Sequence, residues 1–299
     1  MQPYKHVVLV GPTGSGKSAL ALDIARHNGD FEIVSVDAMC VYHGMDVGTA
    51  KPTPTERQEV PHHLIDIVEP SDDYSLARFQ ADCRAAVDDI DGRGKRALLV
   101  GGTGLYVRAA VDGLDVPPRF PELRAVIEDE QDTGALYERL RQADPRAATK
   151  MLPNNRRRIV RALEVCEGSG RTFSSFGPGL DAYPPTAFRL IGLWPPRAAL
   201  AARLEARFAA MLESGFVQEV RALARRPGGL GRTARQALGY RQLLEHVEDG
   251  RTLDACVAEA VRATVQFARR QRVWFRRDPR IAWYPSDVEP AAMRGAPDW

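Results

Sequence analysis

The stretch Gly11-Pro-Thr-Gly-Ser-Gly-Lys-Ser18 decides the fold, because it fits the phosphate-loop pattern and has the sequence context which that pattern requires. A short apolar run at residues 6–10 precedes it, and residues 18–26 follow with the apolar spacing of a helix. In such a loop, glycines let backbone N–H groups converge on an anion, and the start of the helix adds its dipole. Lys17 would reach terminal phosphoryl oxygens, and the Ser18 hydroxyl could ligate Mg²⁺. The opening of the chain therefore predicts a strand, a phosphate-binding loop and a helix.

Two further apolar strands end in residues suited to a ligand site. Residues 31–36 end at Asp37, and residues 97–100 run into Gly101-Gly-Thr-Gly104, with a helical pattern over 74–90 between them. Strands that alternate with helices indicate a parallel, doubly wound sheet, in which ligands bind at the carboxyl ends of the strands. We therefore predict an α/β fold with a P-loop NTPase-like parallel sheet flanked by helices.

The pattern of apolar and turn-forming residues changes after residue 116. Three prolines at 117, 118 and 121 introduce a strand-poor, helical stretch to about residue 167, and a loop rich in Gly, Ser and Pro follows over 168–185. An apolar pattern typical of a strand returns at residues 188–194, and a long helical pattern follows at 197–214. We expect a P-loop core domain of residues 1–116 and 189–299 with C-terminal helices, and a helical insertion domain of residues 117–188.

Composition narrows the class of protein. With 44% hydrophobic and 27% charged residues, the chain is neither disordered nor collagen-like, and its net charge of +2 neither requires nor forbids a nucleic-acid partner. The four cysteines lie too far apart for a disulfide framework or paired zinc ligands. No signal peptide or membrane span is evident, so we expect a cytoplasmic protein with no membrane partner. We also expect it to be a monomer.

Several residues could carry chemistry, and each has a plainer alternative. Motor-type ATPases need an acidic residue where the strand 97–100 has Gly-Gly-Thr, which favours small kinases and other transferases instead. Asp37 could accept a proton from a substrate above the loop, or could merely cap a helix. Thr103 could present its hydroxyl to the same crevice or be an ordinary turn threonine, and Arg197 could meet a phosphate or be a solvated first-turn arginine. The pair His62 and His63 lacks acidic or thiol companions at metal-ligand spacing, which favours a structural or surface role.

Basic clusters are a second signal. Arg156-Arg157-Arg158 with Arg161 lies in the expected insertion, and residues 261–280 carry seven arginines against one aspartate. On a helix, Arg262, Arg269, Arg272 and Arg276 fall roughly along one face, with Phe267, Trp274 and Phe275 interleaved. This pattern is typical of phosphate-backbone contacts with base stacking, and the alternative is a solvated helix face.

Further motifs follow the phosphate loop in a fixed order. They are Val36-Asp37, Val41-Tyr-His-Gly-Met-Asp-Val-Gly-Thr-Ala-Lys-Pro52, Pro61-His-His-Leu-Ile-Asp66, Val100-Gly-Gly-Thr-Gly-Leu-Tyr106, Arg157-Arg158-Ile-Val-Arg-Ala-Leu-Glu-Val165, Gln236-Ala-Leu-Gly-Tyr-Arg241 and Arg269-Arg-Gln-Arg-Val-Trp274. Together they resemble the bacterial type of the tRNA dimethylallyltransferase family, the isopentenyl-tRNA transferases.

The resemblance implies transfer of a dimethylallyl group from dimethylallyl diphosphate to the exocyclic amine of the adenosine just 3′ of a tRNA anticodon, with Mg²⁺ as cofactor. It implies that Asp37 is the general base and that the Thr103 hydroxyl helps to orient it. The residues that it assigns to the diphosphate are Gly11, Pro12, Thr13, Gly14, Ser15, Gly16, Lys17, Ser18 and Arg197, with Ser18 also on the metal. The residues that it assigns to the tRNA anticodon stem-loop are Asp37, Ala38, Met39, Cys40, Thr103, Arg124, Arg157, Arg158, Ile159, Val160, Arg161, Gln236, Ala237, Leu238, Gly239, Tyr240 and Arg241.

Three positions depart from the family's pattern. Gly14, Ala38 and Cys40 stand where the family commonly has Ala, Ser and Gln. A glutamine amide can make paired hydrogen bonds to a base edge and a thiol cannot, so the anticodon-loop contacts at Cys40 are expected to differ while the transfer chemistry is retained. Two alternatives stay open from sequence: a small-molecule or nucleotide kinase with a helical lid, and a non-catalytic RNA-binding protein.

Overall fold

The computed structural model describes residues 4–286 and contains a six-stranded, wholly parallel sheet in the order β3-β2-β4-β1-β5-β6. The strands are β1 His6–Val10, β2 Phe31–Ser35, β3 His62–His63, β4 Arg96–Gly101, β5 Phe188–Trp194 and β6 Ala282–Pro285. The predicted parallel α/β sheet is confirmed, and two short strands that were not predicted are added at its edges, β3 beside β2 and β6 beside β5.

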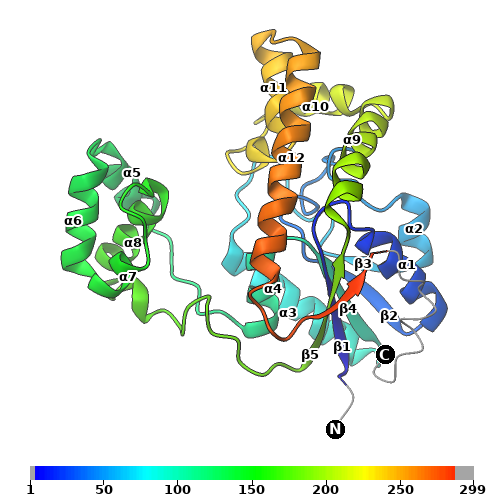
Figure 1. Cartoon of the computed structure of the whole chain (residues 1–299), viewed down its shortest axis with the longest axis horizontal. Helices are drawn as coiled ribbons and strands as arrows, with labels where there is room; N and C mark the ends of the chain where they lie inside the picture. Colours follow the sequence, from blue (N-terminus) through cyan, green and yellow to red (C-terminus); the bar gives the residue numbers. More distant parts are fainter. Residues whose placement is uncertain (1–3, 287–299) are drawn as a thin grey trace. The chain divides into compact units, whose positions relative to one another are not determined.

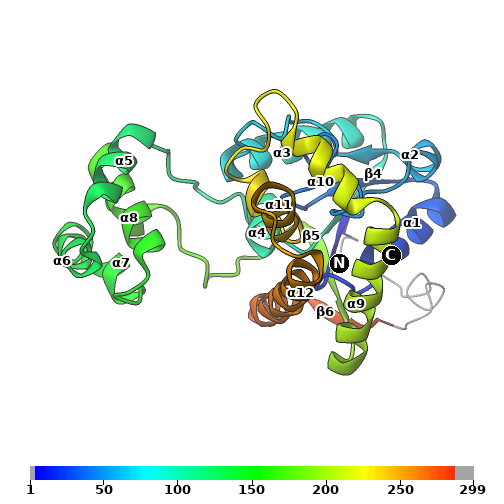
Figure 2. The same cartoon turned by 90° about the horizontal axis from the view of Figure 1, so that it is seen from above.

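Helices cover both faces of this sheet. Helix α1 (Lys17–Asn28) joins β1 to β2, while α3 (Leu76–Gly92) leads into β4 and α4 (Gly104–Asp112) follows it. The chain crosses toward one edge of the sheet on leaving β1 and back again on entering β4. Because parallel crossovers are right-handed, α1 lies on one face and α3 and α4 lie on the other, as Figures 1 and 2 show. A short helix α2 (Pro54–Glu59) precedes β3.

The core forms around the three central strands. Residues 7–10 of β1 are fully buried, and Leu98 and Leu99 of β4 are equally inaccessible. On one face, Leu20, Ala21 and Ile24 of α1 complete a continuous apolar cluster with these strands. Strands covered on both faces need apolar residues on both, which is why residues 6–10 read as an unbroken apolar run.

Four more helices stand beyond the carboxyl edge of the sheet, as Figure 1 shows. They are α9 (Arg197–Glu213), α10 (Phe216–Ala224), α11 (Tyr240–Asp249) and α12 (Leu253–Phe275), with a short 3₁₀ turn at Ala234–Gln236 before α11. Helix α12 packs against both α9 and α11 and reaches α4. These helices therefore form a wall above the ends of the strands. Among residues 4–286, no helix is both long and apolar enough to span a bilayer.

Residues 113–182 form a second compact unit with its own helical core. It contains α5 (Pro121–Asp129), α6 (Thr133–Ala143), α7 (Pro145–Thr149), α8 (Arg156–Ser169) and a 3₁₀ turn at Phe173–Ser175, packed around residues such as Ile127, Leu140 and Leu163. The sequence places this insertion at 117–188. The observed unit closes earlier, because the Tyr183 ring already packs beneath the guanidinium groups of Arg108 and Arg280 in the first unit.

Candidate active site

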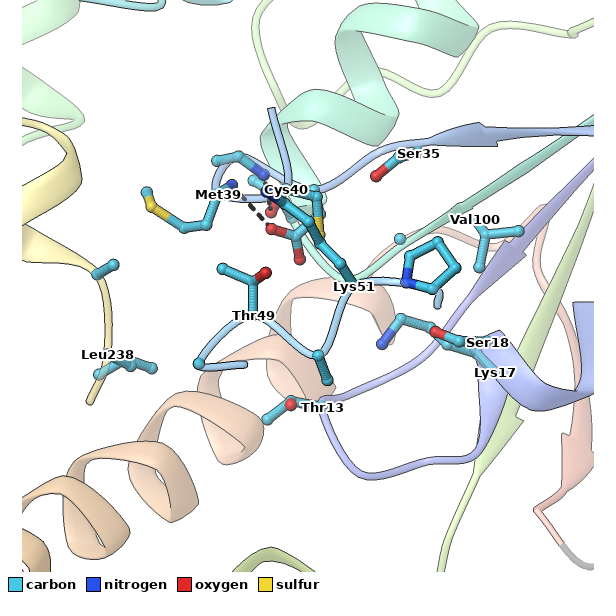
Figure 3. Close-up of a pocket in the computed structure, with 18 of the residues that line it drawn as sticks. Thr13, Lys17, Ser18, Ser35, Met39, Cys40, Thr49, Lys51, Val100 and Leu238 are labelled. Carbon is cyan, nitrogen blue, oxygen red and sulfur yellow. Dashed lines mark hydrogen bonds between the residues drawn. The ribbon is translucent and has the colours of Figure 1, made fainter. Parts of the chain in front are cut away.

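A cleft of about 640 Å³ opens at the carboxyl edge of the sheet. The phosphate loop, the ends of β2 and β4 and the loop 48–52 form one part of its lining. Residues of α9, α10, α11 and α12 and of the segment 236–238 form much of the other part. Figure 3 shows Thr13, Lys17 and Ser18 on one side of this space, with Met39 and Cys40 opposite them. The cleft thus lies where a doubly wound sheet is expected to bind its ligand.

The phosphate loop has the backbone geometry of an anion cradle. Gly14 and Gly16 adopt positive φ angles of 79° and 86°, which L side chains rarely tolerate. Gly16 is the N-cap of α1, so the free N–H groups of the helix start and its dipole point into the cleft region. A Cβ on Gly14 would also lie 2.9 Å from Leu204 of α9, which is why this loop and α9 can pack closely.

Lys17, Arg207 and Asp37 line the same cleft and interact electrostatically. Enclosure by the protein lowers the pKa of the Lys17 ammonium to about 8, with Asp37 opposing the shift and Arg207 adding to it. Burial likewise lowers the pKa of Arg207, and Asp37 again opposes the shift. Positive charge concentrated in a partly desolvated cleft favours a polyanionic ligand.

Arg207 is a residue that the sequence reasoning missed. It lies on α9 with Leu204, Phe208 and Met211, and all four line the cleft at the spacing of one helix face. An arginine inside an apolar helical stripe is unusual, and that interruption was the available signal. Arg197, which the sequence favoured instead, is the first residue of α9, but its side chain lies outside the described part of the structure.

Asp37 and Thr103 lie together at the ends of β2 and β4. The Asp37 Oδ1 atom accepts a hydrogen bond from the Met39 amide at 2.8 Å, and the Thr103 Oγ1 atom accepts one from the Ala38 amide at 3.4 Å. No helix begins at residue 38, so Asp37 closes a local turn and is not a helix cap. A Cβ on Gly101 would lie 2.0 Å from the Val36 carbonyl oxygen, which shows how tightly the two strand ends meet.

Loop 44–52 is tied to the C-terminal helices through Glu219 of α10. The Glu219 carboxylate accepts hydrogen bonds from the amides of residues 46, 47 and 48 at 2.9, 2.7 and 3.2 Å, and from the Tyr240 hydroxyl at 2.5 Å. A Cβ on Gly48 would come within 2.2 Å of the Phe216 ring. The glycine at this position therefore lets the loop reach the cleft while packing against two aromatic rings.

A buried lysine joins two of the sequence motifs. The Lys51 side chain is 2% exposed, and its Nζ atom donates to Tyr42 O at 2.5 Å, Asp46 Oδ1 at 2.7 Å and Asp66 Oδ1 at 2.5 Å. Arg57 adds a second ion pair to Asp66 at 2.7 Å. Asp66 has a positive φ of 53°, a strained backbone that these interactions hold in place.

The two histidines have structural partners. His63 Nε2 lies 2.7 Å from Glu32 Oε2, an atom that also accepts from Arg93. His62 Nδ1 lies 2.7 Å from Val60 O, and burial lowers the pKa of this ring at the cleft wall. Within residues 4–286, no group of three or more His, Cys, Asp or Glu side chains could hold a metal ion.

Most of the remaining site candidates from the first unit meet at the cleft. Ala38, Met39, Cys40, Gln236, Ala237, Leu238 and Tyr240 all line it. Burial, and next Asp37, raises the pKa of the Cys40 thiol to about 12, so this side chain stays protonated. Gly239 is the N-cap residue of α11 and has a φ of 84°. Arg241 is exposed and forms an ion pair with Glu259.

The candidates in the insertion divide into exposed and internal side chains. Arg157 and Arg158 are exposed on α8, whereas the side chains of Ile159 and Val160 are buried in the core of the unit. Within this segment, the two arginines are therefore the side chains best placed to meet RNA. Arg161 donates to the carbonyls of residues 117 and 118, and Arg124 pairs with Glu128 and Glu164.

The expected basic stripe of α12 is interrupted. Arg272 is buried, donates to Pro195 O at 2.5 Å and stacks 3.9 Å from the centre of the Trp194 ring. Phe275 is also buried and offers no stacking surface. Arg262, Arg269 and Arg276 remain exposed. The stripe prediction is wrong for Arg272 because tertiary packing, not helical spacing alone, decides which side chains reach solvent.

This fold and this cleft define a class of protein: α/β proteins that grip a phosphorylated ligand with a phosphate loop at the carboxyl edge of a parallel sheet. Residues 40–278 match the family described as IPP transferase, and residues 4–66 match that described as isopentenyl transferase. The chain belongs to the IPP transferase family, as the sequence motifs predicted.

Individual relatives agree with this assignment. The chain is 49% identical to the tRNA dimethylallyltransferase of Kineococcus radiotolerans over 94% of this chain and 90% of that protein, and 48% identical to that of Streptomyces coelicolor over 94% and 90%. Its structure is similar to the tRNA isopentenylpyrophosphate transferase of Bacillus halodurans, with a TM-score of 0.70, 34% identity and coverage of 97% and 93%. A eukaryotic dimethylallyltransferase acting on tRNA gives a TM-score of 0.77 at 27% identity, covering 97% of this chain and 77% of that one. Neither the kinase nor the non-catalytic RNA-binding alternative is favoured by these relatives.

Glu219→Gln should loosen loop 44–52, because the amide nitrogen of glutamine cannot accept hydrogen bonds from the backbone amides that the carboxylate now serves. We expect the free energy of unfolding to fall by about 1–3 kcal/mol. Urea denaturation measures this, and Glu213→Gln, at an exposed residue of α9, is the matched control. Equal stability of the two variants would contradict the anchoring role of Glu219.

Proposed function

We propose that this chain transfers a dimethylallyl group from dimethylallyl diphosphate to the exocyclic amine of the adenosine 3′ of a tRNA anticodon, with release of diphosphate. The observation that carries the proposal is that Lys17 and Asp37 line one cleft at the carboxyl edge of the sheet. A cation for the leaving group and a carboxylate for the amine are the two functions that this transfer needs. The activities named for the relatives support the same reaction.

The diphosphate lies on the phosphate loop in this proposal. The loop amides, Lys17 and Arg207 surround its oxygens and stabilise the negative charge that grows as the allylic C–O bond breaks. The allylic carbon then carries partial positive charge and bonds to the amine nitrogen. Asp37 accepts the proton that the amine loses, and the electron pair of the broken bond leaves with the diphosphate.

Mg²⁺ fits this cleft as a partner of the diphosphate. Mg²⁺ prefers oxygen ligands and is commonly bound by one or two protein groups together with substrate phosphates. The Ser18 hydroxyl at the start of α1 lines the cleft and is the protein oxygen that would hold it. When bound, the ion would supply further positive charge to the leaving group.

The tRNA must present a base to an enclosed cleft. An adenine inside a stacked anticodon loop cannot reach Asp37, so the base has to leave its stack at a cost of a few kcal/mol. Phe208, Phe267 and Leu238 give the cleft apolar surface for the prenyl chain and the extruded base. Arg157 and Arg158, exposed on the insertion, supply cations for the RNA backbone.

The direct test is incubation of the purified protein with dimethylallyl diphosphate, Mg²⁺ and unmodified tRNA, followed by nucleoside mass spectrometry. We expect one adenosine to gain the mass of a dimethylallyl group in place of a hydrogen. Phosphate transfer from ATP to a small acceptor, with no prenylated nucleoside, would instead establish a kinase.

Asp37→Asn should slow the chemical step by about a hundredfold or more, because the amide cannot accept the amine proton. Its oxygen can still accept from the Met39 amide, so the local turn is preserved. Single-turnover rates and pyrophosphate affinity are the measurements, and the affinity should stay within a few-fold. Asp88→Asn, at an exposed residue of α3, is the control. A near-normal rate in the Asp37 variant would remove this residue from the reaction.

Pyrophosphate binding should depend on the charge of Lys17, whose pKa of about 8 means that it loses its proton as the pH rises through that value. The ratio of dissociation constants, Lys17→Met over wild type, should therefore shrink by about tenfold between pH 7 and pH 9, as the protonated fraction falls. Calorimetric titration measures it, and taking the ratio cancels the ionisation of pyrophosphate. Lys150→Met, at an exposed position, should leave binding unchanged. A ratio near one at every pH would exclude the Lys17 contact.

Arg157→Ala with Arg158→Ala should weaken tRNA binding and flatten the slope of log affinity against log salt by about 0.7 to 0.9 per lost phosphate contact. Arg161 is left intact because it already bonds to two backbone carbonyls of the insertion. Filter binding across a salt series measures the slope, and Arg84→Ala, exposed on α3, is the control. A folded double variant with wild-type affinity and slope would show that α8 merely faces solvent there.

A further inference from the structure

Gln271 of α12 bonds to two loops of the cleft at once. Its Oε1 atom accepts from the Thr13 amide of the phosphate loop at 2.9 Å, and its Nε2 atom donates to Gly102 O, in the loop after β4, at 2.8 Å. The side chain is 7% exposed and lines the cleft. The amide of Gln271 therefore connects two loops of the cleft that lie far apart in the sequence, one at Thr13 and one at Gly102.

The loop after β4 is shaped to receive this helix. A Cβ on Gly102 would lie 2.5 Å from Gln271 Nε2, and a Cβ on Gly104 would lie 2.1 Å from the Trp274 ring. Gln271 and Trp274 are one helical turn apart, so they fill the spaces left by glycines on either side of Thr103. Two of the three glycines in this motif are thus explained by the docking of α12.

The chemistry of the contact selects a glutamine. The Thr13 amide needs an acceptor and the Gly102 carbonyl needs a donor, and a primary amide offers one of each in a single plane. A carboxylate would face the Gly102 oxygen with a second negative oxygen, and an aliphatic side chain would serve neither group. The contact also engages the Thr13 amide, so the anion of the phosphate loop is left to the other loop amides.

We propose that Gln271 is a positioning residue, which sets the separation between the phosphate loop and the Thr103 loop and so aligns the diphosphate with Asp37. This inference rests on the proposed prenyl transfer. Because Gln271 acts through Thr13 and Gly102, its loss should misplace reacting groups rather than remove one of them. Misplacement by about 1 Å can lower a rate by about a hundredfold.

Gln271→Glu gives a test that a merely space-filling role would not pass. A protonated glutamic acid keeps both bonds, since its carbonyl accepts and its hydroxyl donates, whereas the carboxylate keeps only the first. Burial beside a carbonyl oxygen raises the pKa of such a carboxyl group. The ratio of single-turnover rates, wild type over variant, should therefore stay near one at low pH and rise by up to tenfold per pH unit above that pKa, between pH 5.5 and 8.5.

Wild type and the Gln271→Glu variant contain the same native ionisable groups in the cleft, so the titrations of these groups largely cancel in the ratio of rates. These groups are Lys17, Asp37, Cys40, Lys51, Glu56, His62, Arg207 and Tyr240. Gln266→Glu, on the same helix but exposed, introduces the same charge away from the loops and should give a ratio near one at every pH.

Gln271→Leu removes both bonds at nearly constant volume and supplies a second readout. We expect it to remain folded by circular dichroism, to bind pyrophosphate several-fold more weakly and to react about 10- to 100-fold more slowly at all pH values. A pH-independent ratio for Gln271→Glu, or wild-type rates in Gln271→Leu, would overturn the positioning role. If wild type itself formed no prenylated nucleoside, the proposed function would fail, and pyrophosphate affinity would still report whether Gln271 orders the phosphate loop.

Discussion

Parallel pairing of β4 with both β1 and β2 is the constraint on which the site depends. Parallel strands end at a common edge, so the phosphate loop after β1, Asp37 after β2 and Thr103 after β4 are forced into one neighbourhood. The near-contact of Gly101 with the Val36 carbonyl makes that neighbourhood tight, since no side chain fits between the two strand ends. The backbone of the sheet therefore brings these candidate residues together before any side-chain interaction acts.

Charged and polar side chains then hold the loops that the sheet cannot reach. A buried ammonium or carboxylate is costly unless its hydrogen-bonding capacity is filled. Lys51 meets three acceptors and Glu219 meets four donors, so each stabilises a loop through a nearly saturated set of bonds. Within the motif at 44–52, Lys51 ties the loop to Asp66, and Gly48 leaves room for the Phe216 ring.

The sequence predicts those features whose interacting residues lie close together along the chain. The phosphate loop, the strand before it and the helix after it are contiguous, so the pattern at residues 6–26 is sufficient to predict all three. Arg207, Glu219 and Gln271 act across long stretches of chain, and no local pattern says which loop they will meet. The same reason accounts for the interrupted basic stripe of α12: helical spacing places Arg272 on that face, but its side chain is buried against Trp194, a residue far away in the sequence. Of Arg207, Glu219 and Gln271, only Arg207 could be noticed in the sequence, as a charged residue within an apolar helical stripe.

The balance of charge in the cleft also indicates which half of the reaction the protein assists most. Carboxylates are weak bases, with pKa values near 4 in model peptides, and they cannot deprotonate a neutral aromatic amine. The amine proton becomes acidic only as the new N–C bond forms, and then a positioned carboxylate is sufficient to accept it. Departure of the diphosphate is not made easier in this way, because the negative charge of the leaving group must be stabilised throughout the reaction. In the proposed reaction, Lys17 and Arg207, the start of α1 and the loop that Gln271 contacts would all stabilise the departing diphosphate. The preorganised charge of the cleft would then act mainly on the leaving group, and Asp37 would contribute chiefly through its placement.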